Sequence, residues 1–533
     1  MPFDADALSL DRRAFLGAGL AAGSAALLGG DMKPGAKQIP TLEGATIEGL
    51  QAGLADGRWS SADLVRRYQA RIRALDQAGP ALRSVIELNP EAPAIAKALD
   101  AERRAGKIRG PLHGIPVLIK DNIDTADRMQ TTAGSLALLD APRPKADAEV
   151  VRRLREAGAV LLGKTNLSEW ANFRSTRSSS GWSGRGGQTR NPHALDRSPS
   201  GSSSGSGAAV AASLCAVAVG TETDGSIISP ANACGIVGLK PTLGLVSRSG
   251  IIPIAASQDT AGPMARSVRD AALLLGVLAG PDPADPSTAG ARVESDYTRF
   301  LRPGALQGAR LGVVRNLLGV RPQVDRVILP ALEVLKGAGA ILVDVELKSA
   351  AYGDAEYEVL LFEFKAGLEA YFAQRGGPIR DLAGLMAFNE AQADREMPFF
   401  GQEILAQAAA KGPLTEPAYR KALETCAQAR RDITGLLESQ QLQALVGPSG
   451  GPAWLVDHLN GDSGVLSFSR PAAVAGCPHI TVPAGFVFGM PLGLSFVAGP
   501  WQEGAILGLA HAFEQATKAW RAPRFAATCA APR

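Results

Sequence analysis

The chain has 533 residues, of which 46% are hydrophobic and 20% are charged, a composition typical of a folded globular protein. The 55 Lys and Arg residues and 52 Asp and Glu residues leave a net charge of +3, too weak to indicate binding to nucleic acid or to an anionic membrane. The five cysteines lie far apart without the paired spacing of a zinc site, so the sequence predicts no metal and requires no disulfide.

The first 30 residues have the features of a targeting segment. Asp11-Arg-Arg-Ala-Phe-Leu-Gly17 looks like a twin-arginine export motif, and an Ala-, Gly- and Leu-rich stretch follows to about Gly30. That stretch is too short and too weakly apolar to span a bilayer stably, and no second segment approaches membrane length. We therefore predict a signal segment over 1–30, a linker over 31–42 and a periplasmic or secreted protein. An accidental Arg-Arg pair before a helix is the alternative.

Two helices are predicted after the linker, and the second has clear signals at both ends. Ser60 or Ser61 can cap it, Asp63 lies in its first turn, and the chain stops it at Gly79-Pro80. Apolar residues recur along one face of this segment at helical spacing. The apolar run Ile115–Ile119 then reads as a buried strand that ends abruptly at Lys120.

Strands and helices alternate through most of the remaining chain. A helix is expected over 149–157 and a small, apolar, buried helix over 208–219; the strand-like runs are 159–162, 311–314, 341–345, 442–446 and 480–482. Such alternation predicts an α/β fold, which we interpret as one large domain over 43–520 with a central mixed β-sheet covered by helices. A more polar and helical stretch at about 350–430 is expected to be an insert on the substrate side, and 521–533 a C-terminal tail.

Two familiar motifs occur in contexts that argue against them. Gly158-Ala-Val-Leu-Leu-Gly-Lys-Thr165 fits the P-loop pattern, but its apolar middle favours a strand rather than a phosphate-binding loop. Gly201-Ser-Ser-Ser-Gly205 fits the nucleophile elbow of α/β-hydrolases, with Ser203 central and His458, His479 and His511 downstream. A polar loop with two prolines precedes it instead of a core strand, so an α/β-hydrolase is the structural alternative.

Four segments between 200 and 267 occur in a characteristic order. They are Ser200-Gly-Ser-Ser-Ser-Gly-Ser206, Thr221-Glu-Thr-Asp-Gly-Ser-Ile227, Cys234-Gly-Ile-Val-Gly-Leu-Lys-Pro-Thr242 and Asp259-Thr-Ala-Gly-Pro-Met-Ala-Arg-Ser267. Together with Lys120-Asp-Asn they resemble the amidase signature family, over about residues 43–500. Within that family, the segments 166–173 and 181–191 and the triple serine 202–204 are similar to bacterial peptide amidases.

Two departures from the wider family bear on the substrate. Asp224 and Ser204 stand where glycine is common, and the chain has Ile228 and Ser229 where many members carry an arginine nearby. Without that cation, a substrate carboxylate beside the scissile amide lacks a partner, so a neutral amide terminus with a peptide behind it is the better fit.

The resemblance implies a Ser-Ser-Lys catalytic triad. Ser226 would be the nucleophile, Lys120 the base, and Ser202 the proton relay between them, held by a cis peptide bond after Gly201. An amine can act as base only when neutral, and burial at the end of an apolar strand lowers its pKa. The backbone N–H groups of Thr223, Asp224, Gly225 and Ser226 would form the oxyanion hole.

The predicted function is amide hydrolysis through an acyl-enzyme, releasing ammonia from C-terminal peptide amides. Asn172 and Trp454 are candidate substrate contacts, with a surface amide and a packing indole as the alternatives. No metal or organic cofactor is expected, and the partner is a small-molecule or short peptide amide bound by a monomer. Alternatives are a broad aryl or aliphatic amidase, a hydrolase of cyclic or nylon-type oligomers, a component of an amidotransferase and a non-catalytic amide-binding protein.

Overall fold

The computed structural model describes residues 41–347, 352–464 and 466–530, so the predicted signal segment and most of the predicted linker lie outside the described residues. The described residues contain an 11-stranded mixed sheet in the order β1-β3-β2-β6-β8-β7-β12-β13-β11-β9-β10. The strands of this sheet are β1 Val85–Leu88, β2 Pro116–Lys120, β3 Val160–Thr165, β6 Val217–Glu222, β7 Val237–Lys240, β8 Thr260–Ala265, β9 Arg310–Val314, β10 Ile341–Val345, β11 Ala444–Pro448, β12 His479–Val487 and β13 Met490–Val497. A separate two-stranded sheet consists of β4 Trp182–Ser183 and β5 Gly187–Gln188.

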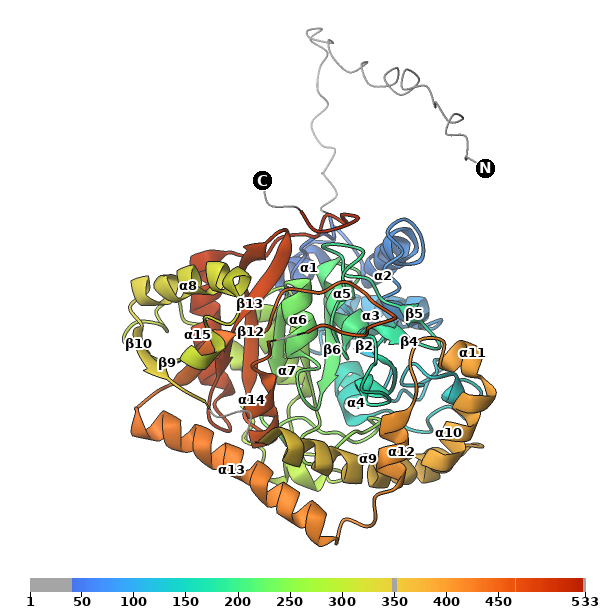
Figure 1. Cartoon of the computed structure of the whole chain (residues 1–533). Helices are drawn as coiled ribbons and strands as arrows, with labels where there is room; N and C mark the ends of the chain where they lie inside the picture. The colour runs from blue at the N-terminus through green and yellow to red at the C-terminus, as the bar shows by residue number, and fades with distance from the viewer. Residues whose placement is uncertain (1–40, 348–351, 465, 531–533) are drawn as a thin grey trace, which may run out of the picture. The chain divides into compact units, whose positions relative to one another are not determined.

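Helices cover the sheet, as Figure 1 shows. They are α1 Ile47–Ala55, α2 Ser61–Arg71, α3 Ala92–Arg104, α4 Glu149–Glu156, α5 Ser204–Ala211, α6 Ile228–Cys234, α7 Val268–Leu278, α8 Pro322–Gly337, α9 Gly353–Arg375, α10 Leu382–Ala391, α11 Ala393–Glu396, α12 Glu403–Ala409, α13 Pro417–Ser439, α14 Ser469–Ala475 and α15 Glu503–Thr517. Helices α5 and α6 pack against each other and against neighbouring strands, while α15 packs on α7, α8 and β12. This mixed sheet covered by helices confirms the predicted α/β class.

The strand pair that positions the site is parallel. Val117 and Ile119 of β2 lie beside Val217 and Val219 of β6 in a parallel register. Because parallel strands point the same way, their carboxyl ends lie at one edge of the sheet. Lys120 at the end of β2 and the loop after Glu222 at the end of β6 therefore meet, although about 100 residues separate them in sequence.

The local predictions near the N-terminus agree with the structure. Ser60 caps α2 through a capping box with Asp63, because the Ser60 hydroxyl accepts from the Asp63 N–H while the Asp63 carboxylate accepts from the Ser60 N–H. The apolar middle of the P-loop-like motif is part of the buried strand β3, and Gly158 before it has a φ of +76°. This geometry leaves no phosphate-binding loop at that motif.

One predicted element is wrong. The segment 208–219 is not a single helix, because α5 ends at Ala211 and β6 begins at Val217. Ser213 between them has a φ of +56°, which a continuing right-handed helix does not allow. The β-branched Val217 and Val219 fit the pleated surface of the sheet, so the apolar run divides into a helix and a buried strand.

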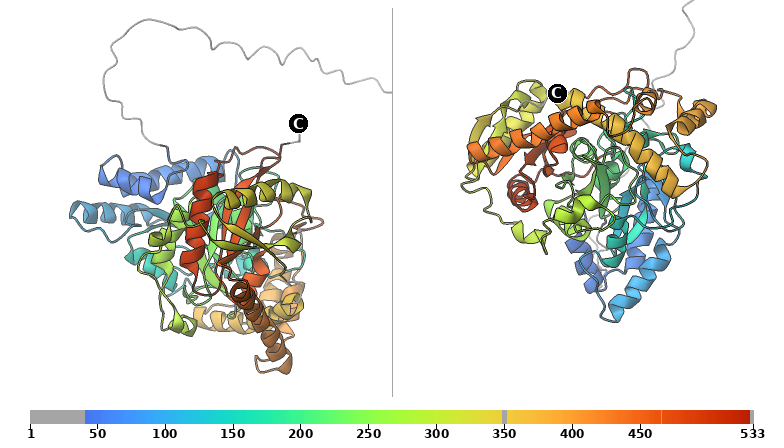
Figure 2. Two further views of the ribbon diagram at one scale, coloured as in Figure 1. Left: turned by 90° about the vertical axis from the view of Figure 1, so that its left-hand side faces the viewer. Right: turned by 90° about the horizontal axis from the view of Figure 1, so that it is seen from below.

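Between β10 and β11 the chain is largely helical, over α9 to α13. Figure 1 shows these helices along the lower and right-hand sides of the sheet, and the view from below in Figure 2 shows the orange and gold helices along one side of the strands. Helix α9 contacts both α12 and α13, and Phe364 and Leu368 of α9 belong to a hydrophobic cluster that also includes Trp170. The helical segment is thus packed onto the loops at the site edge of the sheet.

The state of the cysteines, the grouping of possible metal ligands and the apolarity of the helices are further features of the described residues. All five cysteines are free thiols, and Cys215, Cys234, Cys426 and Cys477 are buried. Within the described ranges, no cluster of His, Cys, Asp or Glu has an arrangement that could hold a metal ion. None of the helices in those ranges combines the length and apolarity needed to cross a bilayer.

Candidate active site

Lys120 is the deepest of the predicted catalytic residues. Its side chain is fully buried at the end of β2, and its Nζ lies 2.7 Å from Ser202 Oγ. Nζ also lies 2.8 Å from Thr221 Oγ1 and 3.3 Å from the Thr221 carbonyl oxygen. Burial lowers the pKa of Lys120 from 10.5 to about 7, although the carboxylates of Asp259 and Glu222 oppose this effect. A substantial neutral fraction at neutral pH follows, as a base requires.

Ser202 lies just before α5, and the peptide bond between Gly201 and Ser202 is cis. A Cβ atom at Gly201 would lie 2.2 Å from Ser168 Oγ, so a larger residue at that position would have to displace the Ser168 hydroxyl. Ser203 fixes this segment against β6, because its Oγ donates to the Thr221 carbonyl (3.0 Å) and accepts from the Thr221 N–H (3.2 Å). Its N–H donates to the carbonyl of Ser226 at 3.1 Å, which joins the two serine-bearing segments directly.

The loop Thr223–Ser226 follows β6 and is shaped by Glu222. The buried Glu222 Oε2 accepts from the N–H groups of Ile227 (2.7 Å) and Ile228 (3.0 Å), so the chain between them curves around the carboxylate. Among the hydrogen bonds that link the described turns and loops, none is donated by the backbone N–H groups of residues 223–226. These four N–H groups next to the candidate nucleophile thus have no hydrogen-bond partner among the described turns and loops.

Two further contacts hold this loop in place. Thr223 Oγ1 donates to Asp259 Oδ1 at 2.5 Å, and the other Asp259 oxygen accepts from two backbone N–H groups, of Ile254 and Ala255. Gly225 has a φ of +78°, and a Cβ there would lie 2.8 Å from Ser469 Oγ. The loop conformation thus needs glycine at 225 for both its backbone angle and its space.

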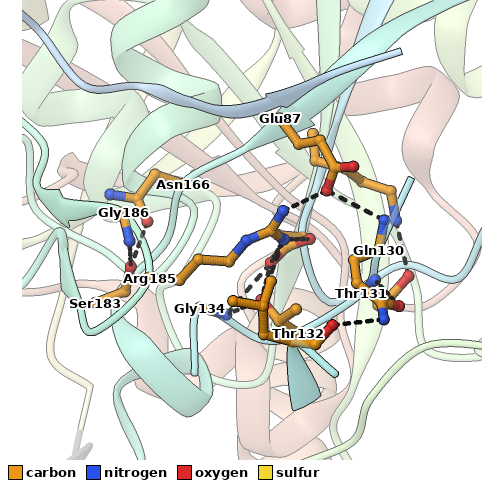
Figure 3. A network of polar contacts seen from close by, with 12 residues as sticks. Glu87, Gln130, Thr131, Thr132, Gly134, Asn166, Ser183, Arg185 and Gly186 are labelled. Carbon is orange, nitrogen blue, oxygen red and sulfur yellow. Dashed lines mark hydrogen bonds and ion pairs between the residues drawn. The ribbon is translucent and has the colours of Figure 1, made fainter. Parts of the chain in front are cut away.

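A polar network supports the turn after Lys120 (Figure 3). The Asp121 carbonyl accepts from the N–H groups of Thr132 and Ala133, and its buried carboxylate accepts from the Thr132 hydroxyl. Arg185 lies 3.4 Å from Asp121 Oδ2 and also pairs with Glu87. These contacts hold the Asp121 side chain in the turn that follows Lys120.

The structure brings Lys120 and Ser202 into contact and joins Ser226 to the same segment through its backbone. No hydrogen bond joins the hydroxyl groups of Ser202 and Ser226 within the described residues. The Ser203–Ser226 backbone bond keeps the two residues adjacent, and catalytic hydrogen bonds often close only when substrate is bound.

The candidate substrate contacts lie in different surroundings. Asn172 ends the short helix η3 Glu169–Asn172 with a φ of +72°, and its Oδ1 is buried without a hydrogen-bond partner in the described structure. Trp454 donates from Nε1 to Asp462 at 2.9 Å. It also lines a cavity of about 480 Å³, which we call the Trp454 cavity, together with Ser200, Asp224, Ser229 and Arg470.

A second cavity of about 410 Å³, which we call the Tyr371 cavity, lies at the other end of the loop. Asn122, Thr221, Thr223 and Tyr371 are among the residues that line it. The loop that carries Ser226 therefore has one cavity beside Thr221 and Thr223 and another beside Asp224 and Ser229. Sequence reasoning predicted neither cavity, because residues from distant segments form both.

Sequence reasoning also missed a polar chain around Asp224. Ser469 Oγ donates to Asp224 Oδ1 at 2.5 Å, and Arg470 Nε donates to Glu356 Oε2 at 2.8 Å. Gln258 Nε2 connects Glu356 Oε1 (3.0 Å) to the Thr223 carbonyl (3.3 Å). Burial raises the pKa of both Asp224 and Glu356, and the positive charge of Arg470 opposes the rise in each. Gln258 precedes a quoted motif, but no sequence signal marks Glu356 or Arg470.

The histidines do not form the alternative hydrolase site. His458 stacks on Phe399, His479 lies 2.6 Å from Ser495 Oγ, and His511 lies near Glu514. The Ser203 hydroxyl is engaged with the backbone of Thr221 instead. Ser203 therefore acts as a structural clamp, and the α/β-hydrolase alternative fails.

Comparisons with known proteins fit this geometry. The Amidase family model matches residues 63–507, and the chain belongs to this family, the amidase signature enzymes. It is an α/β amide hydrolase acting on carbon–nitrogen bonds. The native peptide amidase of Stenotrophomonas maltophilia is similar, with 51% identity and a TM-score of 0.87 over 92% of this chain and 99% of that one.

Two curated relatives have different names. The probable amidase of Arabidopsis thaliana is 40% identical over 501 residues, which cover 91% of this chain and 93% of the relative. A component of the glutamyl-tRNA(Gln) amidotransferase of Chloroflexus aurantiacus is 37% identical over 493 residues, 90% of this chain and 98% of the relative. The family thus includes amidases and amidotransferase components, and the substrate has to be argued from the site.

Proposed function

We propose that this enzyme hydrolyses the C-terminal amide of peptides, with Ser226 as nucleophile and a proton path through Ser202 to Lys120. The observation that carries the proposal is the fully buried Lys120 amine, 2.7 Å from Ser202 Oγ and with a pKa of about 7. A base with that pKa accepts a proton at neutral pH and returns it within the same cycle.

Acylation needs one proton to pass from Ser226 to Lys120 and one to return from Lys120 to the leaving nitrogen. As Ser226 Oγ attacks the amide carbon, its proton passes to Ser202 Oγ, and the Ser202 proton passes to neutral Lys120. The carbonyl oxygen becomes an oxyanion that accepts from the free N–H groups of the 223–226 loop. Lys120 then returns a proton through Ser202 to the amide nitrogen, the C–N bond breaks, and ammonia leaves.

Deacylation repeats the path with water. Water attacks the Ser226 ester while its proton passes through Ser202 to Lys120, and the returning proton restores the Ser226 hydroxyl as the peptide acid leaves. In this scheme every proton is carried by this chain's own residues. The enzyme accordingly acts as a single chain, and EDTA should leave its rate unchanged.

The peptide class is supported by two observations. The chain is 51% identical to a peptide amidase over nearly its whole described length. The residues after the nucleophile, Ile228 and Ser229, supply no cation for a substrate carboxylate, and Ser229 lines the Trp454 cavity. The guanidinium of Arg470 also lines this cavity, but the Asp224 carboxylate beside it offsets its charge, so a neutral peptide amide suits the cavity better than an acidic substrate.

The test is release of ammonia and peptide acid from amidated dipeptides by the purified full chain, with Ser226→Ala as the control. We expect one ammonia per peptide acid, without any added protein, and a higher kcat/KM than for benzamide, acetamide or cyclic oligomers. Turnover only of those simple or cyclic amides would place the enzyme among broad amidases. A need for a second protein would instead favour the amidotransferase role.

We also propose that residues 1–30 direct export by the twin-arginine route. The support is the motif at 11–17 and the weakly apolar stretch behind it. Replacing both Arg12 and Arg13 by Lys should retain the protein in the cytoplasm, measured by cell fractionation. An unchanged distribution between cytoplasm and periplasm would refute the proposal.

A further inference from the structure

Asp224 Oδ2 accepts no hydrogen bond in the described structure, although it forms an ion pair with Arg470. Its Oδ1 accepts from Ser469, but its Oδ2 lies 3.8 Å from Arg470 Nε, beyond hydrogen-bond distance. The side chain is 22% exposed and lines the Trp454 cavity. Ser469 thus orients the carboxylate while leaving one oxygen open to the cavity, two residues from Ser226.

Arg470 presents the complementary donors. Its Nε is occupied by Glu356, and its two terminal nitrogens donate no hydrogen bond to any residue in the described structure. The guanidinium is 45% exposed and lines the same cavity as Asp224. The pair therefore offers one acceptor and at least two donors beside each other, at the mouth of the proposed site.

Resting on the proposed function, we propose that Asp224 and Arg470 bind the peptide unit next to the terminal amide and so select peptide amides over simple amides. Asp224 Oδ2 accepts the N–H of the amidated residue, and Arg470 donates to the carbonyl oxygen of that peptide unit. A simple amide binds at the 223–226 loop equally well, but it has no peptide unit to pair with Asp224 and Arg470.

Covalent geometry agrees with this placement. The nitrogen of the amidated residue is two bonds from the scissile carbonyl carbon, about 2.5 Å away. A group bound at the 223–226 loop must therefore carry that N–H within a few ångströms of the carboxylate at 224. The carboxylate and guanidinium charges also offset one another, which favours a neutral peptide unit over a free ammonium or carboxylate.

The experiment compares three primary amides that differ only upstream. They are N-acetylphenylalanine amide, its ester analogue 2-acetoxy-3-phenylpropanamide, in which oxygen replaces the N–H, and 3-phenylpropanamide, which lacks the unit. We expect the wild-type kcat/KM for the first to exceed that for the ester analogue by about 10- to 100-fold, because the lost hydrogen bond involves a charged acceptor.

Two variants test whether Asp224 and Arg470 produce this preference for the substrate with the N–H group. Asp224→Ala should reduce the ratio between the N–H and ester substrates to below about threefold, whatever it does to the absolute rates. Arg470→Gln should lower kcat/KM for the acetylated amide at least about 10-fold more than for 3-phenylpropanamide, whereas Arg420→Gln on the exposed side of α13 should lower neither selectively.

The outcomes separate the two proposals. Equal turnover of the N–H and ester substrates by the wild-type enzyme overturns this inference while leaving peptide amidase activity in place. Retention of the full ratio in Asp224→Ala also overturns it. No turnover of N-acetylphenylalanine amide, together with turnover of 3-phenylpropanamide, refutes the proposed function itself.

Discussion

The buried Lys120 amine should destabilise the folded enzyme at neutral pH, and Lys120→Met should remove that cost. The pKa of Lys120 falls from 10.5 to about 7 on folding, mainly because of burial. At 1.36 kcal/mol per pH unit, the full cost of holding the charged amine inside is about 5 kcal/mol. Thr221 Oγ1 keeps its hydrogen bond from Asn122 in the variant, so the change to methionine is local.

The sign of the pH dependence follows from proton binding. Below pH 7 both the folded and the unfolded states carry the proton, and the cost is complete. Between pH 7 and 10.5 the unfolded state binds more protons than the folded state, so wild-type stability rises with pH. From pH 7 to pH 9 the wild-type enzyme should gain about 2 kcal/mol relative to Lys120→Met.

Thermal unfolding at several pH values measures this difference. For a body the size of Thr41–Arg533, the unfolding entropy is about 1 kcal/mol/K, so the gap between the two melting temperatures should change by about 2 °C from pH 7 to pH 9. Lys97→Met, at an exposed site on α3, is the matched control and should show no such change. A gap that stays constant from pH 7 to pH 9 would mean that Lys120 is not neutralised by burial.

Three further outcomes follow from the site. The kcat/KM of the wild-type enzyme should fall about tenfold per pH unit below pH 7 and be flat just above it, as initial rates over pH 5–9 will show; a rate that rises as pH falls would exclude a neutral amine base. Ser226→Ala should abolish single-turnover acylation, whereas Ser202→Ala should slow it by about 10²–10⁴-fold; equal, complete losses would argue against a relay. Gly225→Ala should lower kcat by about 10²–10³-fold, with a small change in melting temperature, because the loop cannot keep its φ of +78° beside Ser469. An unchanged kcat in this variant would remove the oxyanion role from the loop.

Helices and strands could be predicted from the sequence where their signals lie in neighbouring residues. The N-terminal cap of α2, at Ser60 or Ser61, and the strand before Lys120 were predicted because each has its signal in neighbouring residues of the sequence. Strands β7 and β8 were not predicted, since β7 is short and β8 contains glycine and proline, which give no strand pattern. Their pairing with neighbouring strands overrides local preference.

The residues of the candidate site show the same contrast between local and distant signals. Lys120, Ser202 and the 223–226 loop lie in short motifs whose order the sequence displays directly. Glu356 and Arg470 lie more than 100 residues from the loop they support, on α9 and α14, and each is an ordinary charged residue in its own segment. Only folding brings them to Asp224, so no local pattern could identify them.

The five free thiols bear on where this protein can function. Because no covalent cross-link joins the described segments, the packing of the sheet and its helices alone maintains the fold. The molecule should therefore be equally stable under reducing and oxidising conditions. If residues 1–30 direct export as proposed, a fold without disulfides needs no thiol oxidase to reach its native state on either side of the membrane.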